Sequence, residues 1–494
     1  MLNDIVTQLC SLLRYDAAAP MLFNSGLFLW LFLIFTVVYA SLQYRTTARL
    51  LFVTLFSYYF YYKSSGVYFV LLAVVSTADF VLARAISHTT LKWKRRLWVT
   101  LSLGLNLGLL GYFKYTNFLG ESFAALLGGS FQPADIFLPV GISFFTFQSL
   151  SYTLDVYRGQ IQPLSRPLDY FFYVSFFPQL VAGPIVRARD FIPQIRRPLV
   201  LSSTMMGEAV VLIAGGLVKK AIISDYISTN FVDRVFDNPL LYSGVENLTA
   251  IYGYALQIYC DFSGYSDMAI GIALLLGFRF PDNFRSPYKS TSVTDFWRRW
   301  HISLSSWLRD YLYISLGGNR LGKVRQYINL MLTMLLGGLW HGASWNFVLW
   351  GGMHGAALAI HKWWMGVTHQ VRGGTALSGW RRVAAILVTF HFVCVTWVFF
   401  RSSTLETCWN MFGQIGSNFN LSILPQLLSG YAPAMVLIAL GYLLHFTPHS
   451  WARRVQASMA LQPLWVKALL LIVVAYIVIQ VKGSDVQPFI YFQF

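Results

Sequence analysis

Charged side chains are the scarcest class in this sequence. Only 12% of the 494 residues are Asp, Glu, Lys or Arg, about half the share that a soluble domain carries. Hydrophobic residues make up 56%, and unbroken apolar runs of roughly 18 residues or more recur along the whole chain. This composition excludes a soluble globular protein. Because the runs do not alternate with polar residues, it also argues against the strands of a membrane β-barrel.

Acidic residues and the usual cofactor motifs are also scarce or missing. The 20 acidic residues against 37 basic ones give a net charge of +17. In a membrane protein this excess faces anionic lipids and does not indicate a nucleic-acid partner. No CxxC spacing links the cysteines, so we expect core side chains rather than zinc ligands or disulfides: Cys10, Cys260, Cys394 and Cys408. No P-loop, GxGxxG, HExxH or serine-nucleophile motif is found, and no bound metal or cofactor is predicted.

The apolar stretches predict an all-α polytopic membrane protein. The candidate spans are residues 21–44, 48–62, 66–84, 97–117, 137–156, 207–223, 247–277, 327–349, 351–365, 383–400, 431–447 and 464–481. Residues 1–20 lack the basic and apolar regions of a cleavable signal peptide, so we expect an extension that forms an interfacial helix or no ordered structure. We expect the catalytic core over 21–382, further membrane helices over 383–481 and a tail over 482–494.

Basic residues predict the orientation, because cytoplasmic loops carry the excess of Lys and Arg. The segments placed in the cytoplasm include 45–49, 84–96, 381–382 and 453–454. Two loops without Lys or Arg are placed outside, 118–136 and 402–430. The last span then runs outward, and the tail is extracytoplasmic.

The apolar segment 170–186 has basic residues on both sides. If both flanks are cytoplasmic, the segment enters the membrane and turns back at Pro178 and at Gly183-Pro184 as a re-entrant loop. The alternative is a simple span with one misplaced basic flank.

Segment 294–320 is too charged to span lipid, and its spacing predicts one amphipathic helix. One face carries Trp297, Trp300, His301, Leu304 and Leu308, and the other carries Arg298, Ser305 and Arg309. His301 is therefore expected to point inward, with the arginines facing headgroups or an anionic ligand. The alternative is an interfacial helix whose histidine is only hydrogen-bonded in the core.

His341 lies in the apolar stretch 333–355. On a helix, sixteen residues from Arg325 at the cytoplasmic edge place it ~24 Å along the axis. An ionisable residue at that depth indicates function, and a neutral imidazole suits a general base. The alternative is a polar residue that holds helices together. His354 follows thirteen residues later and ranks behind it, with packing as its alternative.

Four strings carry a family resemblance: "FFPQLVAGPIVRARDF", "DFSGYSDMAIGIALLLGF", "DFWRRWHISLSSWLRDYLYI" and "LLGGLWHGASWNFVLWGGMHG". Together they resemble the membrane-bound O-acyltransferase (MBOAT) family, most closely its bacterial alginate O-acetyltransferase branch. The teichoic-acid D-alanyl transferases are more distant in resemblance. The similarity extends from Met21 to the end of the chain.

The resemblance implies a ring of about 11–13 membrane helices with re-entrant segments around a thinned core and a cytoplasmic funnel. It implies that His341 is catalytic, that His301 is the second functional histidine, and that Tyr491 in the closing "FIYFQF" relays the acyl group. An aromatic anchor at the interface is the alternative for Tyr491. Further candidates for the cavity or donor site are Trp297, Arg298, Arg299, Trp300, Asp261, Asp267, Trp340 and His354.

The expected function is acetyl transfer from a cytoplasmic thioester, acetyl-CoA or another acyl thioester, across a bacterial inner membrane. His341 would deprotonate the acceptor hydroxyl, and His301 would position or polarise the donor. A periplasmic partner that resembles SGNH hydrolases would place the group on a cell-envelope polymer, with alginate first and cellulose or peptidoglycan open. The alternatives are a D-alanyl- or lipid-directed acyltransferase of the family and a transporter of polymer or lipid.

Overall fold

The computed structural model describes residues 11–17, 20–368 and 377–481. Every regular element in these ranges is a helix, as the apolar runs predict, since only helices satisfy their own backbone in lipid. The described residues form two compact units that interleave along the chain. The first unit contains residues up to 215, 265–281 and those from 456 onward, and the second contains 216–264 and 282–455.

By length and composition, three helical runs could cross a membrane. They are Thr46–His88, Gly379–Arg401 and Leu464–Val481. A fourth candidate is the pair Leu421–Gly430 and Ala432–Phe446, which is bent by 96°. Several other predicted spans are helical but shorter or interrupted, and the protein is an all-α polytopic membrane protein.

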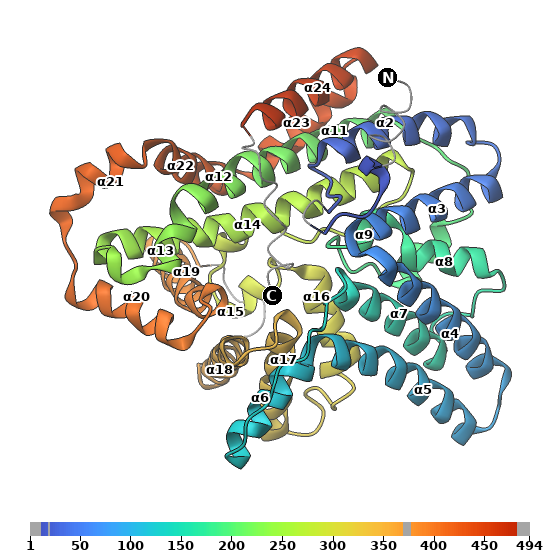
Figure 1. Cartoon of the computed structure of the whole chain (residues 1–494), viewed down its shortest axis with the longest axis horizontal. Coiled ribbons are helices and arrows are strands. Elements are labelled where there is room, and N and C mark those ends of the chain that lie inside the picture. The colour runs from blue at the N-terminus through green and yellow to red at the C-terminus, as the bar shows by residue number, and fades with distance from the viewer. Residues whose placement is uncertain (1–10, 18–19, 369–376, 482–494) are drawn as a thin grey trace. The chain divides into compact units, whose positions relative to one another are not determined.

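The first unit contains α2 Gly26–Ser41, α3 Thr46–Ser65, α4 Phe69–His88, α5 Lys92–Leu110, α6 Thr116–Leu127, α7 Ile142–Tyr157, α8 Pro167–Ser175, α9 Phe177–Leu180, α10 Ala188–Phe191 and α24 Leu464–Val481. Helices α4, α5 and α7 pack together (Figure 1). Their centre holds the buried Asp79 carboxylate, which accepts hydrogen bonds from Ser102 (2.5 Å), Asn106 (2.7 Å) and Ser149 (2.5 Å). Three donors offset the cost of burying this carboxylate, so it joins the three helices.

Two boundaries in the first unit differ from the prediction. Segment 170–186 is not one span, because the helix breaks at Phe176 and the chain turns after Leu180. Gly183 lies against the main chain of Pro178 and Gln179, where a Cβ would overlap backbone atoms. This break favours the re-entrant interpretation over the simple span. The predicted loop 118–136 was wrong at its start, because α6 continues to Leu127.

The second unit contains α12 Asp225–Ile227, α13 Asp233–Asp237, α15 Val293–Trp297, α16 Ile302–Trp307, α17 Lys323–His341, α18 Trp345–Val367, α19 Gly379–Arg401, α20 Leu405–Ser417, α21 Leu424–Gly430 and α22 Ala432–Phe446. Helices α11 Ser203–Leu217, α14 Gly244–Leu275 and α23 His449–Leu461 contribute to both units. The predicted outer loop 402–430 is therefore partly helical.

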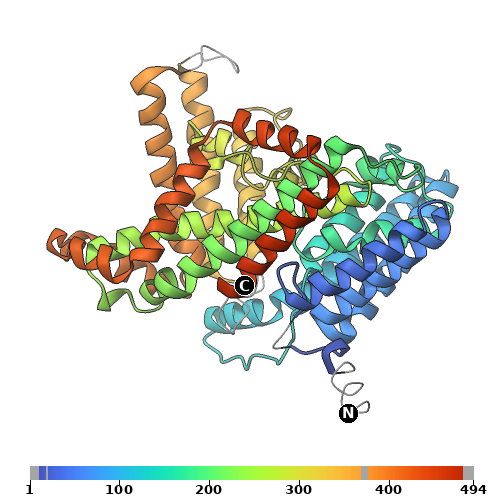
Figure 2. The ribbon, with the colours of Figure 1, turned by 90° about the horizontal axis from the view of Figure 1, so that it is seen from above.

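Helices α17 and α18 form a tightly packed antiparallel hairpin, and α19 packs beside α18 (Figure 2). Glycines permit the close approach of the hairpin helices. A Cβ on Gly338 would overlap the carbonyl of Phe347, and one on Gly351 would overlap the carbonyl of Met334. The predicted span 327–349 was wrong in its extent, because α17 ends at His341 and α18 begins at Trp345. His341 consequently lies at a helix end rather than inside a span.

Candidate active site

His301 lies in a turn between α15 and α16. The predicted single helix over 294–320 was wrong: α15 ends at Trp297, α16 begins at Ile302, and the π-helix η8 Leu308–Tyr313 follows. The His301 backbone has φ 43° and ψ 55°, in the left-handed region. That conformation costs a non-glycine residue roughly 1–3 kcal/mol and is retained where surrounding contacts enforce it, often at functional sites.

Asn283 supplies the contacts that hold this turn. Its main-chain carbonyl accepts a hydrogen bond from the N–H of Ile302 (2.9 Å). Its side-chain Oδ1 accepts from the Ser303 N–H (3.2 Å) and hydroxyl (2.9 Å). The same Oδ1 lies 3.1 Å from His301 Nδ1. The interior face that the sequence predicts survives the break, because Trp300, His301, Leu304 and Leu308 are all buried.

These contacts determine the tautomer of His301. Since the Ser303 N–H must donate, the Asn283 atom facing it is the carbonyl oxygen, which only accepts. His301 Nδ1 therefore carries the hydrogen that bonds to this oxygen, and Nε2 presents a lone pair. Nε2 is buried and has no hydrogen-bond partner among the described residues. Burial lowers the pKa of His301 from 6.5 to about 3, so the imidazole is neutral at physiological pH.

His341 ends α17, and its side chain is buried as predicted. Its ring contacts Trp340, Trp350 and Phe400 in edge-to-face geometry, with ring centroids 5.0, 5.1 and 5.3 Å away. The chain from Lys323 to His341 is helical, so the ~24 Å rise from Arg325 holds. The second unit thus places this imidazole among aromatic rings at the C-terminal end of α17.

The two candidate histidines share one aromatic neighbour. The Trp340 ring centroid lies 6.0 Å from that of His301 and 5.0 Å from that of His341. The two imidazoles are therefore no more than about 11 Å apart, the sum of those distances. The fold brings together residues that are forty positions apart in the sequence. This spacing is short enough for one small substrate to contact both rings.

Both ring nitrogens of His354 form hydrogen bonds to other helices. Trp297 Nε1–H can only donate, and it lies 3.3 Å from His354 Nδ1. Nε2 must then carry the hydrogen, which it donates to Thr396 Oγ1 at 3.1 Å. Thr396 in turn donates to the Val393 carbonyl (2.7 Å). His354 therefore joins α15, α18 and α19, as its packing alternative predicts, and offers no lone pair for proton transfer.

The other candidates on segment 294–320 divide into interior and surface residues. Trp300 is buried against Phe296 and Trp397. Arg298 is exposed, while Arg299 forms an ion pair with Asp295 at 3.0 Å. The tryptophans therefore line the interior next to the histidines, and the arginines face outward, as the two-faced pattern predicts.

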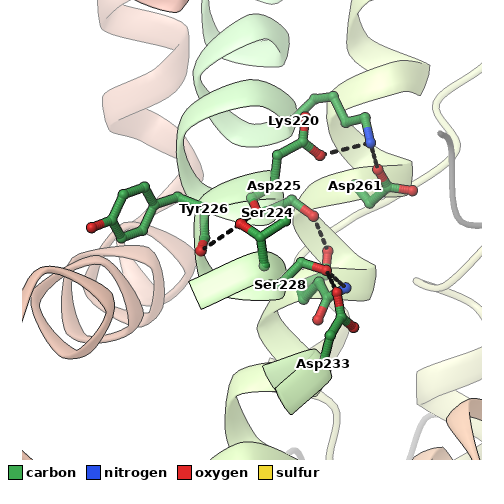
Figure 3. A network of polar contacts seen from close by, with 9 residues as sticks. Lys220, Ser224, Asp225, Tyr226, Ser228, Asp233 and Asp261 are labelled. Carbon is green, nitrogen blue, oxygen red and sulfur yellow. Dashed lines mark hydrogen bonds and ion pairs between the residues drawn. The ribbon is translucent and has the colours of Figure 1, made fainter. Parts of the chain in front are cut away.

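Asp261 belongs to a buried polar network that the sequence reading did not identify (Figure 3). Lys220 Nζ lies 2.5 Å from the Asp261 carboxylate and 2.8 Å from that of Asp225. Gly264 contacts the main chain at Gly216 and Lys220, so α14 and the π-helix η4 Val218–Ser224 approach closely. The next residue after Asp261, Phe262, packs edge-to-face on the His301 ring at 4.5 Å. The network therefore lies next in sequence to a residue that packs on His301.

Lys220 and Asn283 are the site residues that the sequence reading missed. Lys220 lies within the predicted span 207–223, where an ionisable residue indicates function or a partner. Asn283 has no comparable signal. Asp267 lies on the part of α14 that belongs to the first unit, whereas both histidines belong to the second. Tyr491 lies outside the described residues.

The three described cysteines, Cys260, Cys394 and Cys408, are buried and unbonded to one another, as expected of core side chains. Cys10 lies outside the described residues.

Comparison with known proteins agrees with the resemblance in the motifs. The model of the membrane-bound O-acyltransferase family matches residues 82–409, which include both histidines. A Pseudomonas putida protein named probable alginate O-acetylase AlgI is 37% identical over 501 residues, covering 96% of this chain and 100% of its own. The peptidoglycan O-acetyltransferase of Helicobacter pylori is 37% identical over 441 residues, covering 83% and 82%. The teichoic acid D-alanyltransferase of Bacillus subtilis is 29% identical over 279 residues, covering 53% and 68%.

Replacing the buried lysine should destabilise the second unit. Lys220→Met leaves the Asp225 and Asp261 carboxylates buried without their shared cation, which costs about 3–5 kcal/mol. We expect a large drop in the thermal unfolding midpoint of the detergent-purified protein, and partial recovery when Asp261→Asn is added. Lys219→Met is the control, because Lys219 is only half-buried and bonds to Ser263. Equal midpoints for the two lysine variants would show that the network contributes nothing to stability.

The buried neutral His301 should make stability depend on pH. Its folded pKa of about 3 lies below the unfolded value of 6.5, so below pH 6.5 only the unfolded state takes up a proton. The contribution of His301 to the free energy of unfolding is therefore fully present above pH 6.5. It falls by about 1.4 kcal/mol per pH unit as the pH drops toward 3.

The test is thermal unfolding of the wild type and His301→Gln between pH 4.5 and 7.5. We expect a shallower acid-side loss in His301→Gln. His88→Gln, at the exposed end of α4, is the control and should follow the wild type. Parallel curves for the wild type and His301→Gln would contradict the assignment of a neutral, buried imidazole.

Proposed function

The chain belongs to the membrane-bound O-acyltransferase family, and from that premise we propose that it moves an acetyl group from a cytoplasmic thioester toward a cell-envelope polymer. The printed names of its relatives support this class of acceptor, since one names alginate and another names peptidoglycan. The observation that carries the proposal is the pair of buried imidazoles, His301 and His341, in contact with one indole. An ionisable residue buried in an apolar helix bundle is a candidate for chemistry.

In the proposed step, a hydroxyl oxygen attacks the thioester carbonyl carbon. A C–O bond forms, the C–S bond breaks, and the thiol leaves. His341 takes the hydroxyl proton and returns it to the departing sulfur. The aromatic contacts of His341 exclude water around the reacting atoms, and placement of the two reactants supplies much of the rate.

The tautomer of His301 narrows its role. With Nδ1–H bonded to Asn283, the free Nε2 only accepts hydrogen bonds. It therefore does not polarise a carbonyl oxygen, which requires a donor. A neutral acceptor suits an amide N–H on the arm of the donor or the hydroxyl of the acceptor. We assign His301 to positioning a reactant through such a bond.

The acetyl group would then be transferred on the extracytoplasmic side of the membrane. The protein would lie in a bacterial inner membrane with its tail outside, and Tyr491 would carry the acetyl group before an SGNH-like periplasmic partner receives it. The absence of Lys and Arg from 402–430 supports this orientation. Alginate is the first choice of acceptor, since a named alginate O-acetylase matches nearly the whole chain.

Release of thiol from acetyl-CoA by the purified protein in lipid nanodiscs tests the reaction. We expect His341→Ala to reduce the rate by about 10²–10⁴-fold, because it removes the general base. His301→Ala should also reduce it, by the loss of one positioned hydrogen bond. The control is His391→Gln, an exposed residue that pairs with Tyr252 on α14. Wild-type rates from His341→Ala would reject the proposed base, and cargo binding without thiol release would favour a transporter.

The relay is tested by the acetyl content of the exported polymer from cells. Tyr491→Phe removes only the hydroxyl, and we expect polymer acetylation to fall to background while the protein still inserts. Tyr476→Phe, at an exposed position on α24, should leave acetylation unchanged. Normal acetylation with Tyr491→Phe would exclude the relay and leave an interfacial anchor as its role.

A further inference from the structure

Trp350 on α18 places a buried hydrogen-bond donor beside the proposed base. Its ring centroid lies 5.1 Å from that of His341, and the two rings are nearly perpendicular (81°). The Trp350 side chain is fully buried, and its indole N–H has no hydrogen-bond partner among the residues that the structure describes. An indole N–H can only donate a hydrogen bond. Only an acceptor can therefore satisfy it.

Two neighbouring indoles have polar contacts of their own. Trp297 Nε1–H donates to His354 Nδ1 (3.3 Å), and Trp397 interacts with the Tyr288 side chain. A buried donor without a partner costs free energy, and several other buried polar atoms in the described part of the chain also lack one. Trp350 is distinguished from most of these by its contact with the proposed base. Its N–H is therefore a candidate for a bond to a reacting group.

Contacts with side chains and main chain hold the Trp350 ring in place. The ring stacks on Trp397, with centroids 6.0 Å apart and planes at 18°, and it packs edge-to-face on His354 at 4.8 Å. The next residue, Gly351, lies against the Met334 carbonyl on α17, the helix that carries the base. The donor and the base thus belong to one tightly packed hairpin. A donor fixed in this way needs little reorganisation at the moment of reaction.

The proposed reaction requires a donor at the thioester oxygen. When the hydroxyl oxygen adds to the carbonyl carbon, the π electrons of the C=O bond move to the carbonyl oxygen, which becomes an oxyanion. Its collapse re-forms the C=O bond and expels the sulfur, which takes the proton from His341. His301 Nε2 only accepts, and both nitrogens of His354 are already bonded. These two imidazoles therefore do not stabilise the oxyanion, although a fixed donor in an apolar site does so strongly.

We propose that the Trp350 indole N–H donates a hydrogen bond to the carbonyl oxygen of the acyl thioester and stabilises the oxyanion. This assignment rests on the proposed function and adds a catalytic residue to it. A donor about 3 Å from the oxyanion and a base about 3 Å from the attacking hydroxyl must lie close to each other. The 5.1 Å between the centroids of Trp350 and His341 meets this requirement.

The first test removes the N–H and keeps the ring. In 3-benzothienylalanine a sulfur atom takes the place of the indole N–H, and nonsense suppression inserts this amino acid at position 350. Thiol release from acetyl-CoA is measured on the purified protein in nanodiscs. We expect kcat to fall by about 10²–10³-fold, as for the loss of one oxyanion donor. The KM should change little, because the bond strengthens only as charge develops on the oxygen.

The matched control is the same replacement at Trp397, the indole that stacks on Trp350. This control should keep the kcat of the wild type, and both variants should keep its thermal unfolding midpoint. A wild-type kcat from the variant at position 350, or an equal loss of kcat from both variants, would overturn the assignment.

A second measurement does not require turnover. Hydrogen bonding lowers the stretching frequency of a carbonyl group, and infrared difference spectra with ¹³C-labelled acetyl-CoA identify this band for the bound donor in His341→Ala. We expect a lower frequency with Trp350 present than with 3-benzothienylalanine at that position. Equal frequencies would reject the hydrogen bond. If the frequencies differ but the wild type releases no thiol, the proposed function fails while the contact of Trp350 with the carbonyl stands.

Discussion

The hydrogen bond from His301 Nδ1 to Asn283 Oδ1 is the contact on which the geometry of the candidate site depends. It is made where His301 has a left-handed backbone conformation, in the break between α15 and α16. It also fixes the proton on Nδ1 and leaves the Nε2 lone pair facing the buried interior. The same residue orders the chain on both sides of the turn, because Asn283 binds Ile302 and Ser303 as well.

Several other buried polar groups of the bundle have hydrogen-bond partners. Asp79 has three hydrogen-bond donors, Lys220 has two carboxylates, and His354 has a donor on one nitrogen and an acceptor on the other. Such groups join helices and cost little once paired. His301 and His445 each have one paired nitrogen and one buried nitrogen without a hydrogen-bond partner among the described residues. An unmet acceptor in an apolar site costs free energy until a donor group reaches it.

The sequence predicts the helical class, most of the apolar helices and the buried face around His301, because these follow from hydrophobic runs and periodicity. It does not predict the helix break at 298–301. The apolar stripe through Trp297, Trp300 and Leu304 keeps a helical period, and Asn283, whose contacts hold the turn, lies eighteen residues before His301. Lys220 could have been identified from the sequence, because a lysine inside an apolar run indicates a function or a buried partner. The role of His354 needed its partners Trp297 and Thr396, which come from two other helices.

The turn between α15 and α16 directs one side chain outward and another into the interior. Its outward residue, Arg299, pairs with Asp295, and its inward residue, His301, packs on Phe262. Both are held by one pairing of chain segments, Arg285 with Arg299 and Asn283 with Ile302. A change at either arginine therefore acts on the same backbone that sets the imidazole orientation.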